Sequence, residues 1–259
     1  MNRREKIGRM LIILGCLSLV TFLGIYFLQW MEKESVRSEK NEIRKEVREI
    51  IAGHNAKDSE TKKRTVSKDI VRYLQNYYQN EDIVGFLVSE NFVMEEAVVY
   101  TGENDFYDRR DLHREYYLPG TIMLWSRNRS INDPFITLFG HNMEDGEKFG
   151  KLNESKYYKE LEKIDLYTLQ GKNSYCLDYI LKIHVSDYND IDTSQWDGVK
   201  EVLSSSCETY YSSGRDLPEG DNYMLLSTCS VYQTPYRVVA IYREEDRLMK
   251  DQKEKSYEK

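Results

Sequence analysis

A run of 21 uncharged residues near the N-terminus, from Met10 to Trp30, constrains this chain more than any other feature. A helix of that length crosses a bilayer core of about 30 Å. Residues 1–9 hold four cations and one acid, and the positive-inside rule keeps such a flank in the cytoplasm. A cleaved signal peptide is the competing interpretation, but the run is long for one and no small-residue cleavage site follows it. The sequence therefore predicts a cytoplasmic tail, an uncleaved transmembrane anchor over residues 10–30, and the rest of the chain outside the cell.

Two helices are predicted between the anchor and a folded domain. Residues 33–53 are charged, with apolar residues at helical spacing, which is typical of a mostly solvated helix. A polar linker is expected over residues 54–63, and Ser67 is expected to cap a second helix over residues 68–79. We therefore assign residues 31–65 to a juxtamembrane helix and linker.

From residue 83 onward, short apolar runs with period-two patterning predict strands. Helical spacing is confined to a short segment within residues 148–161 and to residues 194–211, in the middle of a long crossover. Seven or eight short strands with few helices favour a closed antiparallel or mixed barrel. The charged residues 244–259 are expected to form a frayed tail. The predicted strands cover residues 83–88, 96–100, 120–125, 135–139, 165–169, 174–185, 223–226 and 238–242.

The composition argues against several functions. The net charge of -7 is the opposite of what a nucleic-acid-binding protein normally carries. The sequence has no Cys-x-x-Cys motif and no zinc-ligand spacing, so no metal or cofactor is predicted. Outside the anchor the chain has three cysteines, so at least one thiol is free or paired with another chain. One interpretation is a disulfide between Cys176 and Cys207, because the domain is expected to be extracellular. The other is that Cys176 is a small core residue.

A thiol and a permanent cation are predicted at the same end of a sheet. The stretch Leu225-Leu226-Ser227-Thr228-Cys229 ends one strand, and Arg237 opens the next, beyond a loop that contains Pro235. A neighbouring cation lowers the pKa of a thiol and can stabilise a developing oxyanion. The alternative interpretation is a half-buried core cysteine beside a surface arginine.

A thiol nucleophile needs a partner that moves protons, and the chain has four histidines to consider. His141 directly follows a strand and Gly140, at the kind of strand exit where catalytic side chains are usually displayed. His54 is expected in the linker, His113 in a charged surface loop and His184 inside a strand. A loop histidine without a role is the alternative interpretation of His141.

Three motifs, taken together, resemble the signatures of the sortases, which are cysteine transpeptidases anchored in Gram-positive cell membranes. They are Phe139-Gly140-His141-Asn142-Met143, Leu226-Ser227-Thr228-Cys229 and Arg237. The two preceding helices, the Gly-His-Asn-Met run and the partly helical crossover are most similar to class B. The resemblance covers about residues 66–243, and the loop with Pro235 departs from the family's pattern, which leaves the substrate class open.

The resemblance implies a mostly β fold: an eight-stranded sortase-type barrel with two N-terminal helices and a helix in the crossover before the cysteine strand. It implies that Cys229 attacks the carbonyl of a threonine in a C-terminal sorting signal and forms a thioester. Arg237 would stabilise the oxyanion, and His141 would protonate the leaving amine and later deprotonate the incoming one. No cofactor is implied. Leu225 to Thr228 would supply strand edge and backbone donors beside the groove. The implied substrate-binding residues are Asn142, Leu226, Ser227 and Thr228.

The partners implied are secreted proteins with a sorting signal, an amine acceptor from a peptidoglycan precursor, and the membrane that holds the N-terminal helix. A pilus-polymerising sortase, with a pilin lysine as acceptor, would use the same chemistry. A non-catalytic, membrane-anchored binding module is the alternative from another class, and it predicts a buried, unreactive Cys229.

Overall fold

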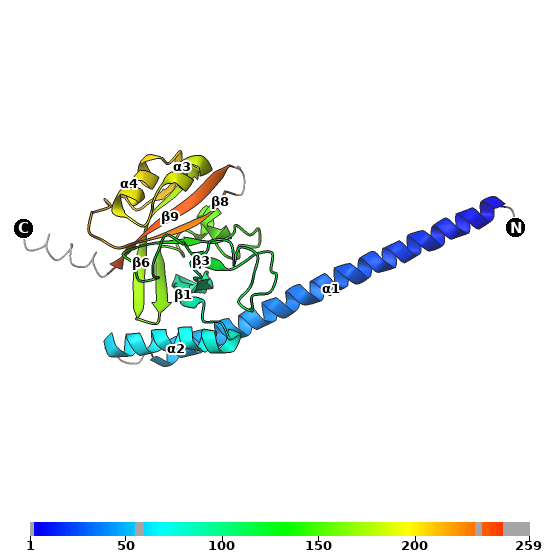
Figure 1. Cartoon of the computed structure of the whole chain (residues 1–259), viewed down its shortest axis with the longest axis horizontal. Coiled ribbons are helices and arrows are strands. Elements are labelled where there is room, and N and C mark those ends of the chain that lie inside the picture. The colour runs from blue at the N-terminus through cyan, green and yellow to red at the C-terminus, as the bar shows by residue number, and fades with distance from the viewer. Residues whose placement is uncertain (1–2, 55–59, 231–234, 246–259) are drawn as a thin grey trace, which may run out of the picture. The chain divides into compact units, whose positions relative to one another are not determined.

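A computed structural model describes residues 3–54, 60–230 and 235–245 of the chain (Figure 1). The chain divides into two compact units, Met1–Gly53 and His54–Lys259. Part of the expected linker, the loop before Pro235 and most of the charged tail lie outside the described residues.

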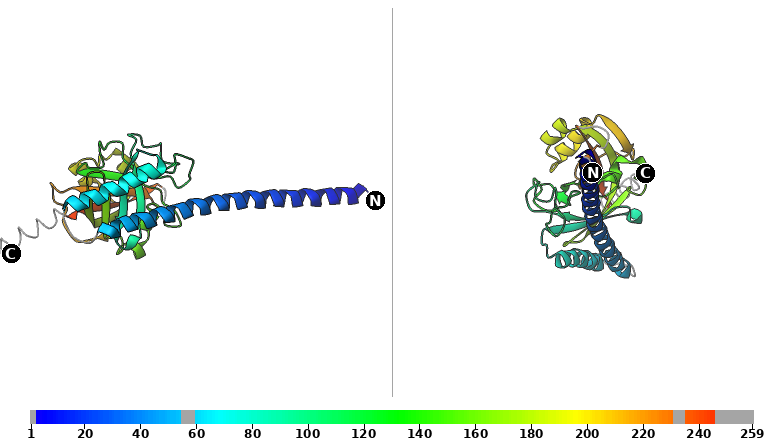
Figure 2. Two further views of the ribbon diagram at one scale, coloured as in Figure 1. Left: turned by 90° about the horizontal axis from the view of Figure 1, so that it is seen from below. Right: turned by 90° about the vertical axis from the view of Figure 1, so that its right-hand side faces the viewer.

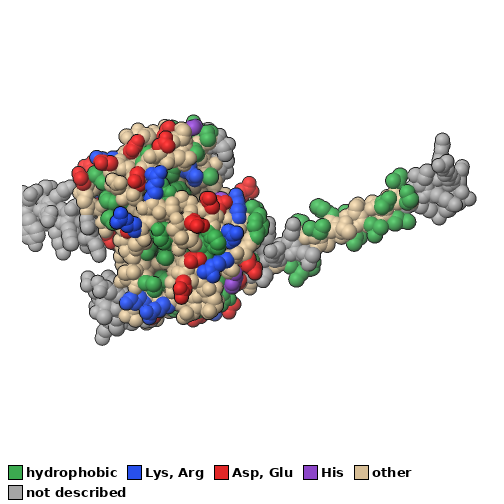
Figure 3. Space-filling view, viewed as in Figure 1, with side chains coloured by type: hydrophobic (Ala, Val, Ile, Leu, Met, Phe, Trp, Pro, Cys, Tyr) green, Lys and Arg blue, Asp and Glu red, His purple; other side chains and the backbone are tan. Residues whose placement is uncertain are grey.

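Helix α1 (Arg3–His54) is continuous over 52 residues. Within it, Met10–Phe27 is long and apolar enough to cross a membrane, and none of this segment is buried in the protein. Figure 3 shows apolar side chains along the segment, in contrast to the mixed charges on the surface of the second unit. A helix with apolar side chains all round is unfavourable in water, which suits a membrane anchor or a signal sequence.

In its described residues the second unit consists mainly of strands, with three helices and three 3₁₀ turns between and around them. The helical elements of this unit are α2 (Glu60–Tyr78), η1 (Glu90–Phe92), η2 (Gly150–Asn153), η3 (Ser155–Tyr157), α3 (Val185–Asp190) and α4 (Trp196–Ser204). The strands are β1 (Ile83–Ser89), β2 (Glu95–Val99), β3 (Ile122–Leu124), β4 (Phe135–Phe139), β5 (Lys163–Thr168), β6 (Lys172–His184), β7 (Glu208–Ser212), β8 (Tyr223–Cys229) and β9 (Tyr236–Glu244).

Eight of these strands close into a barrel, in the order β5-β1-β2-β3-β4-β8-β9-β6, because β6 pairs back with β5. The pairs β2–β3 and β4–β8 are parallel, while the other neighbours in the ring are antiparallel. Strand β7 pairs with β6 outside this ring. The prediction of a closed, mixed, eight-stranded barrel is confirmed.

Helix α2 lies across β1 and β5, as Figure 2 shows from the side of the helix. The prediction that Ser67 caps this helix is wrong, because the helix already begins at Glu60, within the expected linker. Ser67 lies inside the helix, and its hydroxyl donates to the Thr168 carbonyl at 2.6 Å and accepts from the Thr168 N–H at 2.8 Å. These bonds tie the helix to the end of β5.

The crossover before β8 only partly matches the prediction. A helix was expected over residues 194–211; it forms over the shorter range of α4, and α3 precedes it. The last part of that range is strand β7 instead, paired antiparallel with β6. The side chains of β7 are mostly exposed, so it lacks the apolar alternation from which a strand is predicted.

Strands β8 and β9 are buried on both faces, which explains why the sequence reads as continuous apolar runs there. Alternate side chains of each strand enter two different apolar clusters. Even-numbered residues, such as Leu226 and Ala240, pack inside the barrel. Odd-numbered residues, such as Leu225 and Val239, pack on the outer face beneath α3 and α4. An odd-numbered residue at the end of either strand therefore emerges beside these helices.

Candidate active site

The pairing of β8 with β9 places Cys229 and Arg237 side by side. The two residues lie opposite each other in the antiparallel register, and such pairs share one face with Cβ atoms about 4.5–5.5 Å apart. Both positions are odd-numbered and so continue the outer face beneath α3. Cys229 is exposed and its thiol is free, which does not fit the buried cysteine expected of a core residue or of the binding module.

The pairing of β4 with β8 brings His141 to the same end of the sheet. These strands are parallel, with Phe139 opposite Ser227, and the Gly140 N–H donates to the Ser227 carbonyl at 3.2 Å. His141 follows Phe139 by two residues, as Cys229 follows Ser227. Since side chains alternate along extended chain, both groups continue the same outer face.

Gly140 is required where the chain leaves β4. A Cβ at this position would lie 2.8 Å from the ring of Phe149, which is fully buried. The Phe149 N–H in turn donates to the His141 carbonyl at 3.1 Å. The close packing of this ring therefore fixes the backbone on both sides of Gly140, and with it the position of His141.

His141, Cys229 and Arg237 all line one open pocket of about 480 Å³. Four residues were expected to bind substrate, and all four are described by the structure. Of these, Ser227 lines the pocket, and Asn142, Leu226 and Thr228 do not. Trp125 forms part of the same wall, with the guanidinium of Arg127 4.6 Å from its ring centroid. The lining also includes Asp105, Asp108, Arg127, Phe139 and Tyr188.

Strand β8 does not offer the free edge that was expected to contact substrate. It pairs with β4 on one side and β9 on the other. Leu226 packs inside the barrel, and Thr228 is fully buried. The amide of Asn142 donates to the Cys229 carbonyl at 3.0 Å, so its side chain contacts the backbone of the cysteine. The expectation of an accessible strand edge is therefore wrong.

The guanidinium of Arg237 lies beside two aromatic rings. Its Cζ is 5.6 Å from the ring centroid of Phe139 and 5.9 Å from that of Tyr188, within the range of a cation–π interaction. The Nε atom is buried and makes no hydrogen bond within the described part of the chain. The Nε–H therefore has no hydrogen-bond acceptor among the described residues.

Tyr188 contributes a neutral wall beside this cation. Burial raises the pKa of Tyr188 to about 12, and the hydroxyl of Ser227 and the charge of Arg237 oppose that effect more weakly. The phenol therefore stays protonated at neutral pH. It gives Arg237 an aromatic surface without neutralising its charge.

His141 is held by Asp108, a residue to which no sequence motif points. The Nε2 atom of His141 lies 2.9 Å from the Asp108 carbonyl oxygen and 3.0 Å from its Oδ1. Asp108 belongs to the loop between β2 and β3, 33 residues before the histidine. No motif or periodicity links the two positions, so the contact becomes visible only in the fold.

His113, His184, Cys176 and Cys207 do not line this pocket. The ring of His113 packs edge-on against Tyr78, and the side chain of His184 caps α3. Cys176 and Cys207 are both free thiols, so they form no disulfide. No cluster of three or more metal-ligating side chains occurs among the described residues.

Comparisons with solved structures identify the fold. No protein-family model matches the chain, and no curated protein matches it. A Staphylococcus aureus sortase B–substrate complex aligns with a TM-score of 0.66 at 21% identity, over 83% of this chain and 98% of that one. A mutant form of Clostridium perfringens sortase B gives 0.59 at 22% identity, over 70% and 89% of the two chains. Sortase B from B. anthracis in complex with AAEK2 gives 0.57 at 22%, over 68% and 82%. The chain has the sortase fold, and the prediction of a sortase-type barrel most like class B is confirmed for the fold.

Proposed function

We propose that this chain is a membrane-anchored cysteine transpeptidase that transfers proteins with a C-terminal sorting signal to an amine of the cell wall. The observation that carries the proposal is the convergence of Cys229, His141 and Arg237. They come from the ends of three adjacent strands of a sortase barrel, they share one face, and they line one open pocket.

In the first step, the thiolate of Cys229 attacks the carbonyl carbon of a threonine in the sorting signal. Negative charge develops on the carbonyl oxygen, where the guanidinium of Arg237 donates a hydrogen bond. The carbon–nitrogen bond then breaks, and the imidazolium of His141 gives its proton to the leaving amine. The products are a thioester on Cys229 and the released C-terminal peptide.

In the second step, an acceptor amine attacks the thioester. Neutral His141 takes a proton from the amine as the new carbon–nitrogen bond forms, and the sulfur leaves as thiolate. The histidine is again an imidazolium and the cysteine again a thiolate, so the enzyme returns to its starting state. The transferred protein keeps its threonine, now joined to the acceptor.

The acceptor is proposed to be an amine of a peptidoglycan precursor. One solved sortase B is described as complexed with triglycine, which carries a free amine; it aligns with a TM-score of 0.65 at 21% identity. The apolar segment of α1 would hold the enzyme in the membrane, with its N-terminus in the cytoplasm and the barrel outside. A pilin lysine as acceptor is the second version of the same chemistry.

The proposal is tested with the full-length chain in detergent and a library of peptides that contain threonine-bearing sorting signals. Each peptide is offered with triglycine, with diaminopimelate or with a lysine peptide, and the products are identified by mass spectrometry. The expected result is cleavage after threonine and ligation to one acceptor class. If no peptide is cleaved under any of these conditions, the proposed function is wrong.

Replacing Arg237 with lysine is expected to lower kcat about 100-fold, the usual loss when an oxyanion donor is removed. Lysine keeps the positive charge but loses the planar donor group that lies beside Phe139 and Tyr188. Steady-state cleavage of the best peptide measures the effect. Arg129→Lys, at an exposed position outside the pocket lining, is the matched control and should behave as wild type. Equal activities of Arg237→Lys and wild type would show that Arg237 does not act as proposed.

A further inference from the structure

We infer that Asp108 is the positioning residue for His141, an inference that rests on the proposed function and deepens it. Nε2 of His141 faces two oxygen atoms of Asp108, its carbonyl at 2.9 Å and its Oδ1 at 3.0 Å. Both are acceptors, so this ring nitrogen carries a hydrogen. In the neutral ring the lone pair is then on Nδ1. Asp108 thereby selects Nδ1 as the nitrogen that exchanges protons with the two amines.

The residue directly before Asp108 anchors the loop. Tyr107 is only 1% exposed, and its hydroxyl donates to Asp82 Oδ2 and accepts from Asn80 Nδ2, both at 2.7 Å. Burial, and secondarily the hydrogen bond to Asp82, raise the pKa of Tyr107 to about 12, so the hydroxyl stays a donor at neutral pH. The Thr121 N–H also donates to the Tyr107 carbonyl at 3.0 Å. The backbone beside Asp108 is thus fixed by buried contacts.

Gly120 lies at the end of this loop and packs against the Asp108 carbonyl oxygen, which is the oxygen in contact with Nε2 of His141. Its φ of +58° lies in the left-handed region that favours glycine. A Cβ at this position would lie 2.3 Å from the Asp108 carbonyl oxygen. Any side chain at position 120 would therefore displace this acceptor. Tyr107 and Gly120 therefore both hold Asp108 in place.

The charge of Asp108 also acts on His141. Its carboxylate lies between the imidazole and the Nε of Arg109, which is 3.5 Å from Oδ2. When His141 is the imidazolium of the proposed first step, Oδ1 of Asp108 is the carboxylate oxygen that faces its Nε2–H. The imidazolium stabilises a nearby thiolate and is the form that protonates the leaving amine. The other charged or titratable side chains that line the pocket are Asp105, Arg127, Tyr188, Cys229 and Arg237.

The test is Asp108→Ala in the full-length chain in detergent, with two readouts. The kcat for cleavage of a sorting-signal peptide is expected to fall about 10-fold, because the imidazole loses the carboxylate oxygen that orients it and keeps only the backbone carbonyl of residue 108 as an acceptor. KM should change little, since Asp108 acts through His141. Independently of any peptide, alkylation of Cys229 by iodoacetamide at neutral pH should slow several-fold, because an imidazole that is less firmly held in place is a poorer partner for the thiolate. Mass spectrometry of the peptide that contains Cys229 separates this thiol from the other three.

Two further variants complete the experiment. Asp108→Glu keeps the carboxylate and should regain part of both rates. Glu103→Ala removes an exposed carboxylate from the same loop, outside the pocket lining, and should leave both unchanged. Unchanged kcat and alkylation in Asp108→Ala would overturn the inference, as would an effect on KM alone. If the wild-type chain cleaves no peptide, the proposed function fails, while the alkylation rates still decide the role of Asp108.

Discussion

Replacing Cys229 with alanine is expected to reduce cleavage of sorting-signal peptides by more than about 1,000-fold, to the background of the assay. The thiol is exposed at the end of β8 and lines the pocket with His141 and Arg237. Without the thiol of Cys229 no thioester forms, so there is no acylation step in which His141 can transfer a proton. Product analysis of cleavage and ligation by the full-length variant in detergent gives the result directly.

Cys207→Ala is the matched control for this prediction. Its thiol is also free and exposed, but it lies in the crossover and does not line the pocket. This variant is expected to keep wild-type turnover. Turnover of Cys229→Ala within about tenfold of wild type would contradict the account, because removing a covalent nucleophile costs far more than that.

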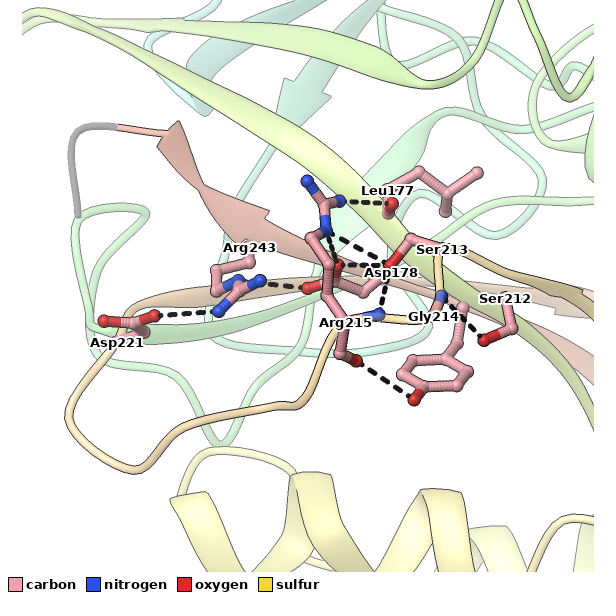
Figure 4. A network of polar contacts seen from close by, with 9 residues as sticks. Leu177, Asp178, Ser212, Ser213, Gly214, Arg215, Asp221 and Arg243 are labelled. Carbon is pink, nitrogen blue, oxygen red and sulfur yellow. Dashed lines mark hydrogen bonds and ion pairs between the residues drawn. The ribbon is translucent and has the colours of Figure 1, made fainter. Parts of the chain in front are cut away.

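Replacing Asp178 with alanine is expected to lower the free energy of unfolding by about 3–5 kcal/mol, the usual cost of breaking a buried ion pair. Asp178 is fully buried in β6 between two arginines (Figure 4). Its Oδ1 is 2.7 Å from Nε of Arg215, and its Oδ2 is 3.1 Å from Nε of Arg243. Arg243 is only 4% exposed. Loss of Asp178 would leave this cation with Asp221, at 3.4 Å, as its remaining ion-pair partner among the described residues.

Urea unfolding of the full-length chain in detergent, followed by tryptophan fluorescence, measures this loss. Asp197→Ala is the control, because Asp197 and Lys200 form an ion pair whose side chains are 87% and 53% exposed. Exposed pairs of this kind contribute less than about 1 kcal/mol. If the two variants lose the same small amount, the buried ion pairs of Asp178 do not contribute the stability expected of them.

Much of the barrel could be predicted from sequence because most strands bury at least one face. The apolar run of β4 was predicted with its observed bounds, and the runs of β8 and β9 were found because both of their faces are covered. Strand β7 was missed because it lies at the end of the sheet order with mostly exposed side chains. Hydrophobic periodicity reports burial, and a strand without burial gives no such signal.

The site was predictable only in part, for a related reason. The motifs identified His141, Cys229 and Arg237, and the antiparallel pairing of β8 and β9 followed from their closeness in sequence. The parallel pairing of β4 with β8, which brings the histidine to the cysteine, is a long-range contact that no local pattern encodes. The same holds for Asp108, whose contact with His141 depends on the buried anchor of Tyr107 and on the space left by Gly120.

The central claim is that Cys229 becomes acylated, and mass spectrometry of the trapped enzyme tests it most directly. The full-length chain is mixed with a cleavable sorting-signal peptide, quenched in acid and digested with trypsin. The account predicts an added mass equal to the peptide up to and including threonine. It should lie on the fragment of residues 216–237, whose single cysteine is Cys229, and should be removed by hydroxylamine. Cleavage of the peptide with the adduct on another cysteine, or with no adduct under conditions that trap thioesters, would contradict the account.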